Sequence, residues 1–315
     1  MVRIKHFDYF FVKRGGETTN FSLMADITPS NYQYIMAFYI RPHVLEVRMN
    51  RPEKRNAMSP RVWQEIGHVF SEIVPAEADC RCVILTGAGK VFSAGIELAG
   101  ANTFGGGHGG KRLDGAQRAV TTLKSGGAWQ NAWKAINLCT KPVIACMQRG
   151  CFGAALEMVC FADIRYCTQD CIFQAPEVDL GIAADLGGNQ LFPKIIGNDS
   201  LVRELQFSGR RFTSEEALQF GLVSKICKDQ TELMQQGLEM ATMIAEKSPI
   251  AVMGVKTMLN YSRDHNVEDS LRFGLTWNTG MAQTKDMAIA GQAFFEKKKP
   301  VFENAPTLKD RDSKL

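Results

Sequence analysis

The sequence predicts an α/β fold followed by a helical C-terminal region. Strand-like and helix-like stretches alternate from about residue 44 to residue 166, and from about residue 199 the pattern is almost continuously helical. Such alternation favours a largely parallel sheet with helices on its faces. The chain has 315 residues, of which 45% are hydrophobic and 22% charged, so it is long enough to bury a sizeable core.

The N-terminal part supplies the expected strands. Residues 44–49 alternate in polarity and end at the turn Asn50-Arg51-Pro52, which is typical of a strand and its exit. Residues 60–74 have apolar side chains at helical spacing. The next expected elements are strands at residues 82–86, 142–147 and 164–166, and helices at residues 116–138 and 152–161.

The C-terminal part is expected to consist of helices at residues 201–207, 214–220, 231–246, 250–261, 267–281 and 286–297. Ser214, followed by two glutamates, is the expected N-cap of the second of these helices. Their apolar stripes would cover the core or contact a partner subunit. The expected segments are an N-terminal extension at residues 1–43, an α/β core at 44–200, a helical region at 201–300 and a tail at 301–315.

Composition and charge argue against several classes of protein. The net charge of +4 is spread along the chain without a basic, aromatic-interleaved patch, so no nucleic-acid partner is predicted. No apolar run reaches the ~18 residues of a membrane span. The histidines are scattered and no CxxC pair occurs, so no metal site is predicted. The nine cysteines, an odd number, are expected to be reduced and buried.

The two ends of the chain differ in how well they match known targeting signals. The last three residues, Ser313-Lys314-Leu315, form the tripeptide that the peroxisomal import receptor reads at a free C-terminus. Residues 1–16 contain four basic side chains but also Asp8 and an unbroken run from Phe7 to Val12, a poor match to a mitochondrial leader. The sequence therefore predicts a peroxisome or a related organelle such as a glycosome, in preference to a mitochondrion.

Two glycine-rich stretches invite a nucleotide-binding interpretation. Residues 105–112 read GGGHGGKR, which has Arg112 where a P-loop requires Ser or Thr, and no strand precedes them. Gly87-Ala88-Gly89 follows an expected strand but lacks the third glycine of a dinucleotide-binding turn. We interpret residues 105–112 as a surface loop, and NAD is not expected as a cofactor.

Two other stretches of small residues and three carboxylates carry more information. Residues 91–98 (VFSAGIEL) follow a strand, and residues 150–157 (GCFGAALE) lead from a strand into a helix. Free N–H groups from two such stretches, converging on one carbonyl oxygen, would stabilise an enolate. Close helix packing is the alternative explanation for the small residues. The carboxylates are Glu157 at the start of its helix, Glu177, and Asp185 in a run of small residues, where it could instead cap a turn.

These residues resemble the crotonase superfamily of enoyl-CoA hydratases and isomerases, from about Val44 to the C-terminus. The matching motifs are residues 50–57 (NRPEKRNA), 92–97 (FSAGIE), 141–145 (KPVIA), 153–157 (GAALE), 162–165 (ADIR) and 192–197 (FPKIIG). Within the superfamily the chain is most similar to the Δ3,5-Δ2,4-dienoyl-CoA isomerases. That similarity rests on residues 164–167 (IRYC), 177–185 (EVDLGIAAD) and 261–265 (YSRDH), and on the Ser-Lys-Leu ending.

The resemblance implies a spiral of ββα turns with a helical C-terminal trimerisation region, assembled as a homotrimer or homohexamer. It implies an acyl-CoA thioester substrate and an oxyanion hole made by the N–H groups of Ile96 and Ala154. The substrate-binding residues would be Ala94, Gly95, Ile96, Glu97, Leu98 and Ala154. Glu177 and Asp185 match the two proton-transfer carboxylates of the isomerases, and Glu157 matches an accessory acid. No metal or redox cofactor is implied.

Departures from the isomerase pattern keep two alternatives open. Glu157 stands where dienoyl-CoA isomerases have Asp, and with Glu177 it reproduces the carboxylate pair of enoyl-CoA hydratases, whereas Asp185 stands where hydratases have glycine. Ala154 and Ala155 replace glycines that the family favours. A non-catalytic crotonase-fold binding protein is the other alternative, since fold does not fix function. Lys54 and Arg55 are candidate contacts for the phosphates of coenzyme A.

Overall fold

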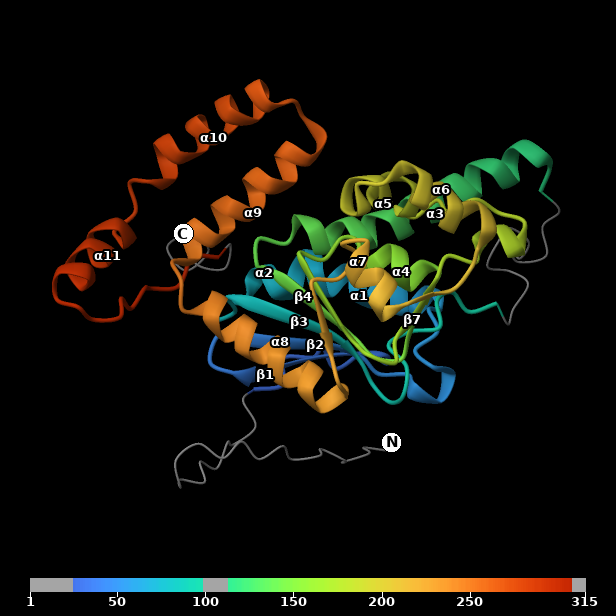
Figure 1. Cartoon of the computed structure of the whole chain (residues 1–315), viewed down its shortest axis with the longest axis horizontal. Coiled ribbons are helices and arrows are strands. Elements are labelled where there is room, and N and C mark those ends of the chain that lie inside the picture. Colours follow the sequence, from blue (N-terminus) through green and yellow to red (C-terminus); the bar gives the residue numbers. More distant parts are fainter. Residues whose placement is uncertain (1–24, 99–112, 308–315) are drawn as a thin grey trace.

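The computed structural model describes residues 25–98 and 113–307, which form a mixed sheet covered by helices on both faces (Figure 1). Within these ranges the main sheet has the order β1 (Ile35–Arg41), β2 (Val44–Met49), β3 (Cys82–Gly87), β4 (Val143–Met147), β6 (Ile164–Thr168) and β9 (Lys225–Cys227). β1 is antiparallel to β2, and every other neighbouring pair in the sheet is parallel. The predicted α/β class with largely parallel pairing is confirmed.

A second, smaller sheet lies beside the first. It contains β5 (Gly150–Phe152), β7 (Ile172–Gln174) and β8 (Phe212–Thr213). β5 and β7 are parallel, whereas β7 and β8 are antiparallel. This sheet carries the chain from β4 into helix α4 (Ala154–Val159), and it therefore positions one of the two predicted N–H donors.

Alternating side chains of the main sheet build two separate cores. On β3, Val83 and Leu85 join the larger core, which contains residues of α1 (Pro60–His68), α3 (Gly115–Leu138) and α4. Cys82 and Ile84 point the other way, into the core beneath α8 (Gln230–Ala245). This period of two is what a strand buried on both faces requires. The functional residues predicted from the sequence lie on the side of the larger core.

Several short elements connect these layers. They are the 3-10 helices η1 (Pro52–Lys54) and η3 (Glu177–Leu180), the π-helical segment η2 (Val69–Ile73), and the helices α2 (Val74–Ala76), α5 (Gly188–Ile196), α6 (Asp199–Ser208) and α7 (Ser214–Gln219). η2 and α2 continue the direction of α1, so together these three segments fill the single helix predicted at residues 60–74.

The last helices project away from the sheet (Figure 1). They are α9 (Pro249–Asp264), α10 (Val267–Met281) and α11 (Asp286–Phe295). Lys256 of α9 anchors this region, because its buried ammonium donates to Asp163 Oδ2 at 2.7 Å and to two backbone carbonyls of the core. α10 buries none of its residues, and Leu275 on this helix is 73% exposed.

The structure corrects four boundaries. The extension expected at residues 1–43 contains β1, whose pairing with β2 makes it part of the core. The α/β core does not end near residue 200, since β9 extends the main sheet. The helix expected at residues 152–161 begins only at Ala154, because Gly153, with φ of 52°, turns the chain between β5 and α4. The cap expected at Ser214 is Thr213, whose hydroxyl accepts from Glu216 N–H.

The cysteine prediction is confirmed, since all nine are free and buried. In the described ranges no helix is long and apolar enough to cross a membrane. The glycine-rich stretch at residues 105–112 and the Ser313-Lys314-Leu315 tripeptide lie outside the described residues.

Candidate active site

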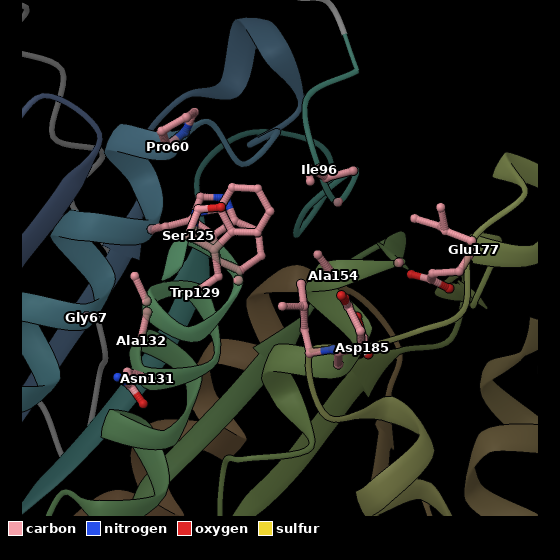
Figure 2. A pocket seen from close by; sticks show the side chains of 18 of the residues that line it. Pro60, Gly67, Ile96, Ser125, Trp129, Asn131, Ala132, Ala154, Glu177 and Asp185 are labelled. Carbon is pink, nitrogen blue, oxygen red and sulfur yellow. Dashed lines mark hydrogen bonds between the residues drawn. The ribbon is translucent and has the colours of Figure 1, made fainter. Parts of the chain in front are cut away.

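A cavity of about 890 Å³ opens between α1 and α3 on one side and the loops around Ile96, Ala154 and Glu177 on the other. Figure 2 shows Trp129 and Ser125 of α3 on one wall, with Ile96, Ala154, Glu177 and Asp185 across from them. The cavity is lined mainly by apolar and small side chains, with a few carboxylates converging at one end. Such a combination is typical of a small-molecule site.

Tryptophans form the apolar wall. Trp63 of α1 stacks on Trp129 of α3 with ring centroids 5.2 Å apart, and both line the cavity. The two helices approach closely at Gly67, where an added Cβ would lie 3.1 Å from Ala132 Cβ. This wall presents no charged group of its own, so it suits a hydrocarbon chain.

The loop after β3 is held by Asn56, from the motif at residues 50–57. Its side-chain amide donates to the carbonyls of Ala88, Val91 and Phe92 at 2.8 to 3.0 Å. A Cβ on Gly87 would lie 2.3 Å from Phe92 O, so glycine is needed for this close approach. Gly87 and Gly89 therefore shape a turn, and no nucleotide-binding role is needed to explain them.

Two segments then run side by side into the cavity. Ser93 and Cys151 form a parallel bridge, in which Ser93 N–H donates to Gly150 O and Phe152 N–H donates to Ser93 O. The register brings Ile96 and Ala154 to the same end of the cavity. Neither residue's N–H donates to an acceptor among the described residues.

The direction of the Ile96 N–H follows from its neighbours. Met58 N–H donates to Gly95 O, and Met58 O accepts from Glu97 N–H. In a parallel bridge of this kind the polar groups of the intervening residue, Ile96, point away from Met58. At Ala154 the N–H belongs to the first turn of α4, where helical N–H groups have no partner within the helix. Both residues line the cavity and their N–H groups have no acceptor among the described residues, which suits an oxyanion hole.

Most of the predicted substrate-binding residues line this cavity: Ala94, Gly95, Ile96, Leu98 and Ala154. Glu97 instead turns its carboxylate to Arg51, which holds it with two hydrogen bonds of 2.8 and 3.0 Å. Arg51 also donates to Ala57 O at 3.1 Å. Arg51 and Glu97 thus fix the loop that presents Ile96. Lys54 and Arg55 are exposed and lie outside the cavity lining.

Glu177 begins η3 and is 8% exposed. A Cβ on Gly153 would lie 3.1 Å from Glu177 Oε1, which places this carboxylate beside the start of α4. Its Oε2 is buried and has no hydrogen-bond partner among the described residues. Burial, with a further contribution from the charge of Asp185, raises the pKa of Glu177. A buried carboxylate oxygen without a partner is rare in folded proteins and is characteristic of a functional group.

Glu157 is also buried, but it is paired. Its Oε1 accepts the N–H groups of Leu186 at 3.1 Å and Gly188 at 2.8 Å. Burial is the main cause that raises the pKa of Glu157 to about 7, and the charges of Glu177 and Asp185 raise it further. No local pattern in the sequence indicates these contacts, because the partners are 29 and 31 residues away.

Asp185 differs from both glutamates because its side chain is exposed at the cavity. Its carboxylate makes no hydrogen bond with the described residues, whereas its backbone carbonyl accepts from Gln130 Nε2 at 2.7 Å. The three predicted carboxylates therefore meet at one cavity in three environments: buried and unpaired, buried and paired, and exposed. Among the residues that the structure describes, no group of three His, Cys, Asp or Glu side chains is arranged to hold a metal ion.

The environment of Glu157 predicts how stability changes with pH. Because the pKa of this carboxyl is about 7 in the folded protein and 4.5 for an unperturbed glutamate, the folded state binds more protons between these values. The contribution of this group to stability should therefore fall by about 3 kcal/mol as the pH rises from 4.5 to 7. Urea unfolding of the protein and of Glu157→Gln across this range should give curves that diverge, with the Gln variant gaining relative stability at higher pH.

Exposed Glu72 supplies the control, since Glu72→Gln should follow the unmodified protein at every pH. Parallel stability curves for Glu157→Gln and the unmodified protein would show that Glu157 titrates normally.

Comparison with known proteins agrees with this geometry. The enoyl-CoA hydratase/isomerase family model matches residues 40–305. A mitochondrial Delta(3,5)-Delta(2,4)-dienoyl-CoA isomerase of Mus musculus is 43% identical over 275 residues, which cover 87% of this chain and 83% of the relative. A peroxisomal enzyme of the same name from Arabidopsis thaliana is 36% identical over 264 residues, covering 82% of this chain and 92% of the relative.

A solved structure gives the same result for the fold. The crystal structure of an enoyl-CoA hydratase from Bacillus anthracis superposes with a TM-score of 0.76 at 27% sequence identity, covering 87% of this chain and 100% of that chain. The crotonase-type fold inferred from the sequence motifs is therefore confirmed. The chain belongs to the enoyl-CoA hydratase/isomerase family.

Proposed function

We propose that the protein isomerises 3,5-dienoyl-CoA to 2,4-dienoyl-CoA in fatty-acid β-oxidation. The observation that carries the proposal is that buried Glu177 and exposed Asp185 line one cavity together with Ile96 and Ala154. Among the described residues, Glu177 Oε2 has no hydrogen-bond partner and the N–H groups of Ile96 and Ala154 have no acceptor. The similarity to dienoyl-CoA isomerases over most of the chain supports the same reaction.

The reaction needs two proton transfers at separated carbons. Glu177 takes a proton from C2 of the substrate, the electron pair moves through the conjugated system, and the negative charge reaches the thioester oxygen. The N–H groups of Ile96 and Ala154 stabilise this trienolate, and one such donor contributes roughly 3 kcal/mol in a protease. Asp185 then delivers a proton at C6, which leaves double bonds at C2 and C4. These steps use no metal or redox cofactor.

The environments of the carboxylates suit this division of roles. A base that removes a weakly acidic proton is strengthened by a raised pKa, and burial provides this for Glu177. Asp185 is open to solvent, from which it regains the proton that it delivers at C6. Glu177 releases the proton that it took from C2 before the next turnover, so the cycle closes. Glu157 lines the same cavity and completes the set as an accessory acid.

Hydration of a 2-enoyl-CoA is the second candidate activity. The observation that favours it is that Glu157 and Glu177 line the same cavity and their charges interact, as a pair that holds an attacking water would require. Asp185 has no role in hydration. Binding without turnover is the third candidate.

Asp185→Asn separates these candidates. We expect the variant to isomerise 3,5-dienoyl-CoA about 10²-fold more slowly, the usual contribution of one general acid, with solvent supplying the residual protons. Absorbance of the conjugated product measures isomerisation, and loss of the enoyl thioester absorbance measures hydration of 2-enoyl-CoA. Fast hydration that Asp185→Asn leaves unchanged, without dienoyl turnover, would contradict the isomerase proposal. Turnover of neither substrate would favour a binding protein.

We also propose a homotrimer or homohexamer. Supporting this, α10 buries no residue and carries Val267, Leu271 and Leu275, all at least 66% exposed, while α11 ends in Phe294 and Phe295, which are 80% and 84% exposed. Apolar surface of this extent usually marks an interface, and a further copy of the chain is the proposed occupant.

We place the protein in a peroxisome or a related organelle such as a glycosome, with the peroxisomal import receptor as its partner. Support comes from Ser313-Lys314-Leu315 and from the peroxisomal relative in Arabidopsis thaliana. The mitochondrial relatives leave the mitochondrion as the alternative location.

A further inference from the structure

The segment that carries Asp185 is held in an unusual way. Within the described ranges, no backbone-to-backbone hydrogen bond involves residues 183–186. The segment lies between η3 and α5, and Gly187, with φ of 125°, follows it directly. A chain segment without backbone pairing has no intrinsic reason to hold one conformation, so its position depends on contacts from elsewhere.

Side chains from three helices supply those contacts. Gln130 of α3 donates to Asp185 O, and Asn189 of α5 donates to Ala184 O, each at 2.7 Å. Glu157 of α4 accepts from the N–H groups of Leu186 and Gly188. The peptide groups on both sides of Asp185 are therefore fixed although its carboxylate remains free to react.

Gln130 differs from Asn189 and Glu157 because it belongs to α3, the helix that forms the opposite wall of the cavity. Asn189 follows the segment closely in the chain, and Glu157 is itself a candidate for the chemistry. Gln130 lies between Trp129 and Asn131, both of which line the cavity from the α3 wall (Figure 2). Its amide therefore joins the wall proposed to contact the acyl chain to the segment that carries the second proton-transfer group.

We propose that Gln130 is a positioning residue that fixes the distance between Asp185 and the acyl chain lying along Trp129. The inference rests on the proposed isomerase function. Proton delivery at C6 requires the carboxylate within hydrogen-bond reach of that carbon, and a misplacement of about 1 Å can lower a rate by ~10²-fold. Gln130 itself does not touch the reacting atoms.

Gln130→Met tests the proposal, because methionine keeps the length and helix propensity of glutamine but has no N–H donor. We expect kcat for 3,5-dienoyl-CoA to fall about tenfold with KM nearly unchanged. Gln235→Met is the matched control, since Gln235 is an exposed residue of α8 that donates to Glu239 at 3.0 Å. This control should retain full activity.

The same substitution in an Asp185→Asn background distinguishes positioning from a general effect on the fold. If Gln130 acts through Asp185, Gln130→Met should cause no further loss once the carboxylate is gone. An equal tenfold loss in both backgrounds would overturn the proposal.

Hydrogen exchange separates this inference from the proposed function. Peptides containing residues 183–188 should exchange faster in Gln130→Met than in Gln235→Met, whichever reaction the protein catalyses. Unchanged exchange would overturn the positioning role of Gln130. If exchange is faster but the unmodified protein does not turn over 3,5-dienoyl-CoA, the hydrogen bond from Gln130 does hold the segment, and the proposed isomerase function is wrong.

Discussion

Replacing Glu177 by glutamine is expected to lower kcat for 3,5-dienoyl-CoA by on the order of 10⁴-fold. The carboxylate is the proposed base, it is buried beside the start of α4, and no other described carboxylate lies as near to Gly153. Solvent cannot easily replace it, since the side chain is only 8% exposed. Absorbance of the conjugated product in a steady-state assay measures the loss.

Glu177→Gln should fold normally. Its Oε2 makes no hydrogen bond with the described residues that an amide would break. Replacing a buried ionisable group by a neutral one also removes the free-energy cost of burying a charge. The thermal midpoint should therefore stay at or above that of the unmodified protein, and Glu72→Gln should match the unmodified protein in both measurements. Isomerase activity within tenfold of normal in Glu177→Gln would show that another group removes the C2 proton.

Replacing Gly95 by alanine is expected to lower kcat by on the order of 10³-fold, because it displaces a donor of the proposed oxyanion hole. Gly95 has φ of 81°, and an added Cβ would lie 2.5 Å from Phe152 O and 3.6 Å from Ala154 N. A contact of 2.5 Å with a backbone atom forces the two parallel segments apart. The N–H groups of Ile96 and Ala154 would then no longer converge on one oxygen.

Gly127→Ala is the control for this experiment, since an added Cβ there meets nothing within 4 Å. It should keep full activity and gain slightly in stability, as glycine does when replaced by alanine within a helix. Single-turnover kinetics with bound substrate would show whether the step lost in Gly95→Ala is chemistry. A Gly95→Ala variant that turns over normally would mean that the thioester oxygen binds elsewhere.

The larger elements of the fold could be predicted because their sequence patterns are local. β2, β3, β4 and β6 are apolar strands separated by helices, and the strand at residues 44–49 has the bounds that the pattern indicated. β5 and β7 were missed, since each has only three residues and is defined by pairing with strands far away in the chain. β1 was missed because the N-terminal part was interpreted as an extension.

The sequence predicted which residues form the candidate site but not how they are arranged in space. Glu157, Glu177, Asp185, Ile96 and Ala154 all reach the cavity, and their catalytic roles remain predictions. The arrangement depends on contacts between residues far apart in the chain. Gln130 and Asp185 are 55 residues apart, and nothing in the surroundings of a surface glutamine on a helix indicates such a partner.

The free carboxylate of Asp185 has a consequence for how this family could change reactions. A side chain that is exposed and makes no hydrogen bond with the described part of the chain can be exchanged at little cost in stability, since large losses come from buried or networked groups. Natural selection or directed evolution can therefore replace the acid at position 185 while hydrogen bonds from Gln130 and Asn189 still hold the backbone there. The position offers a route to new substrate chemistry in which each intermediate sequence still folds.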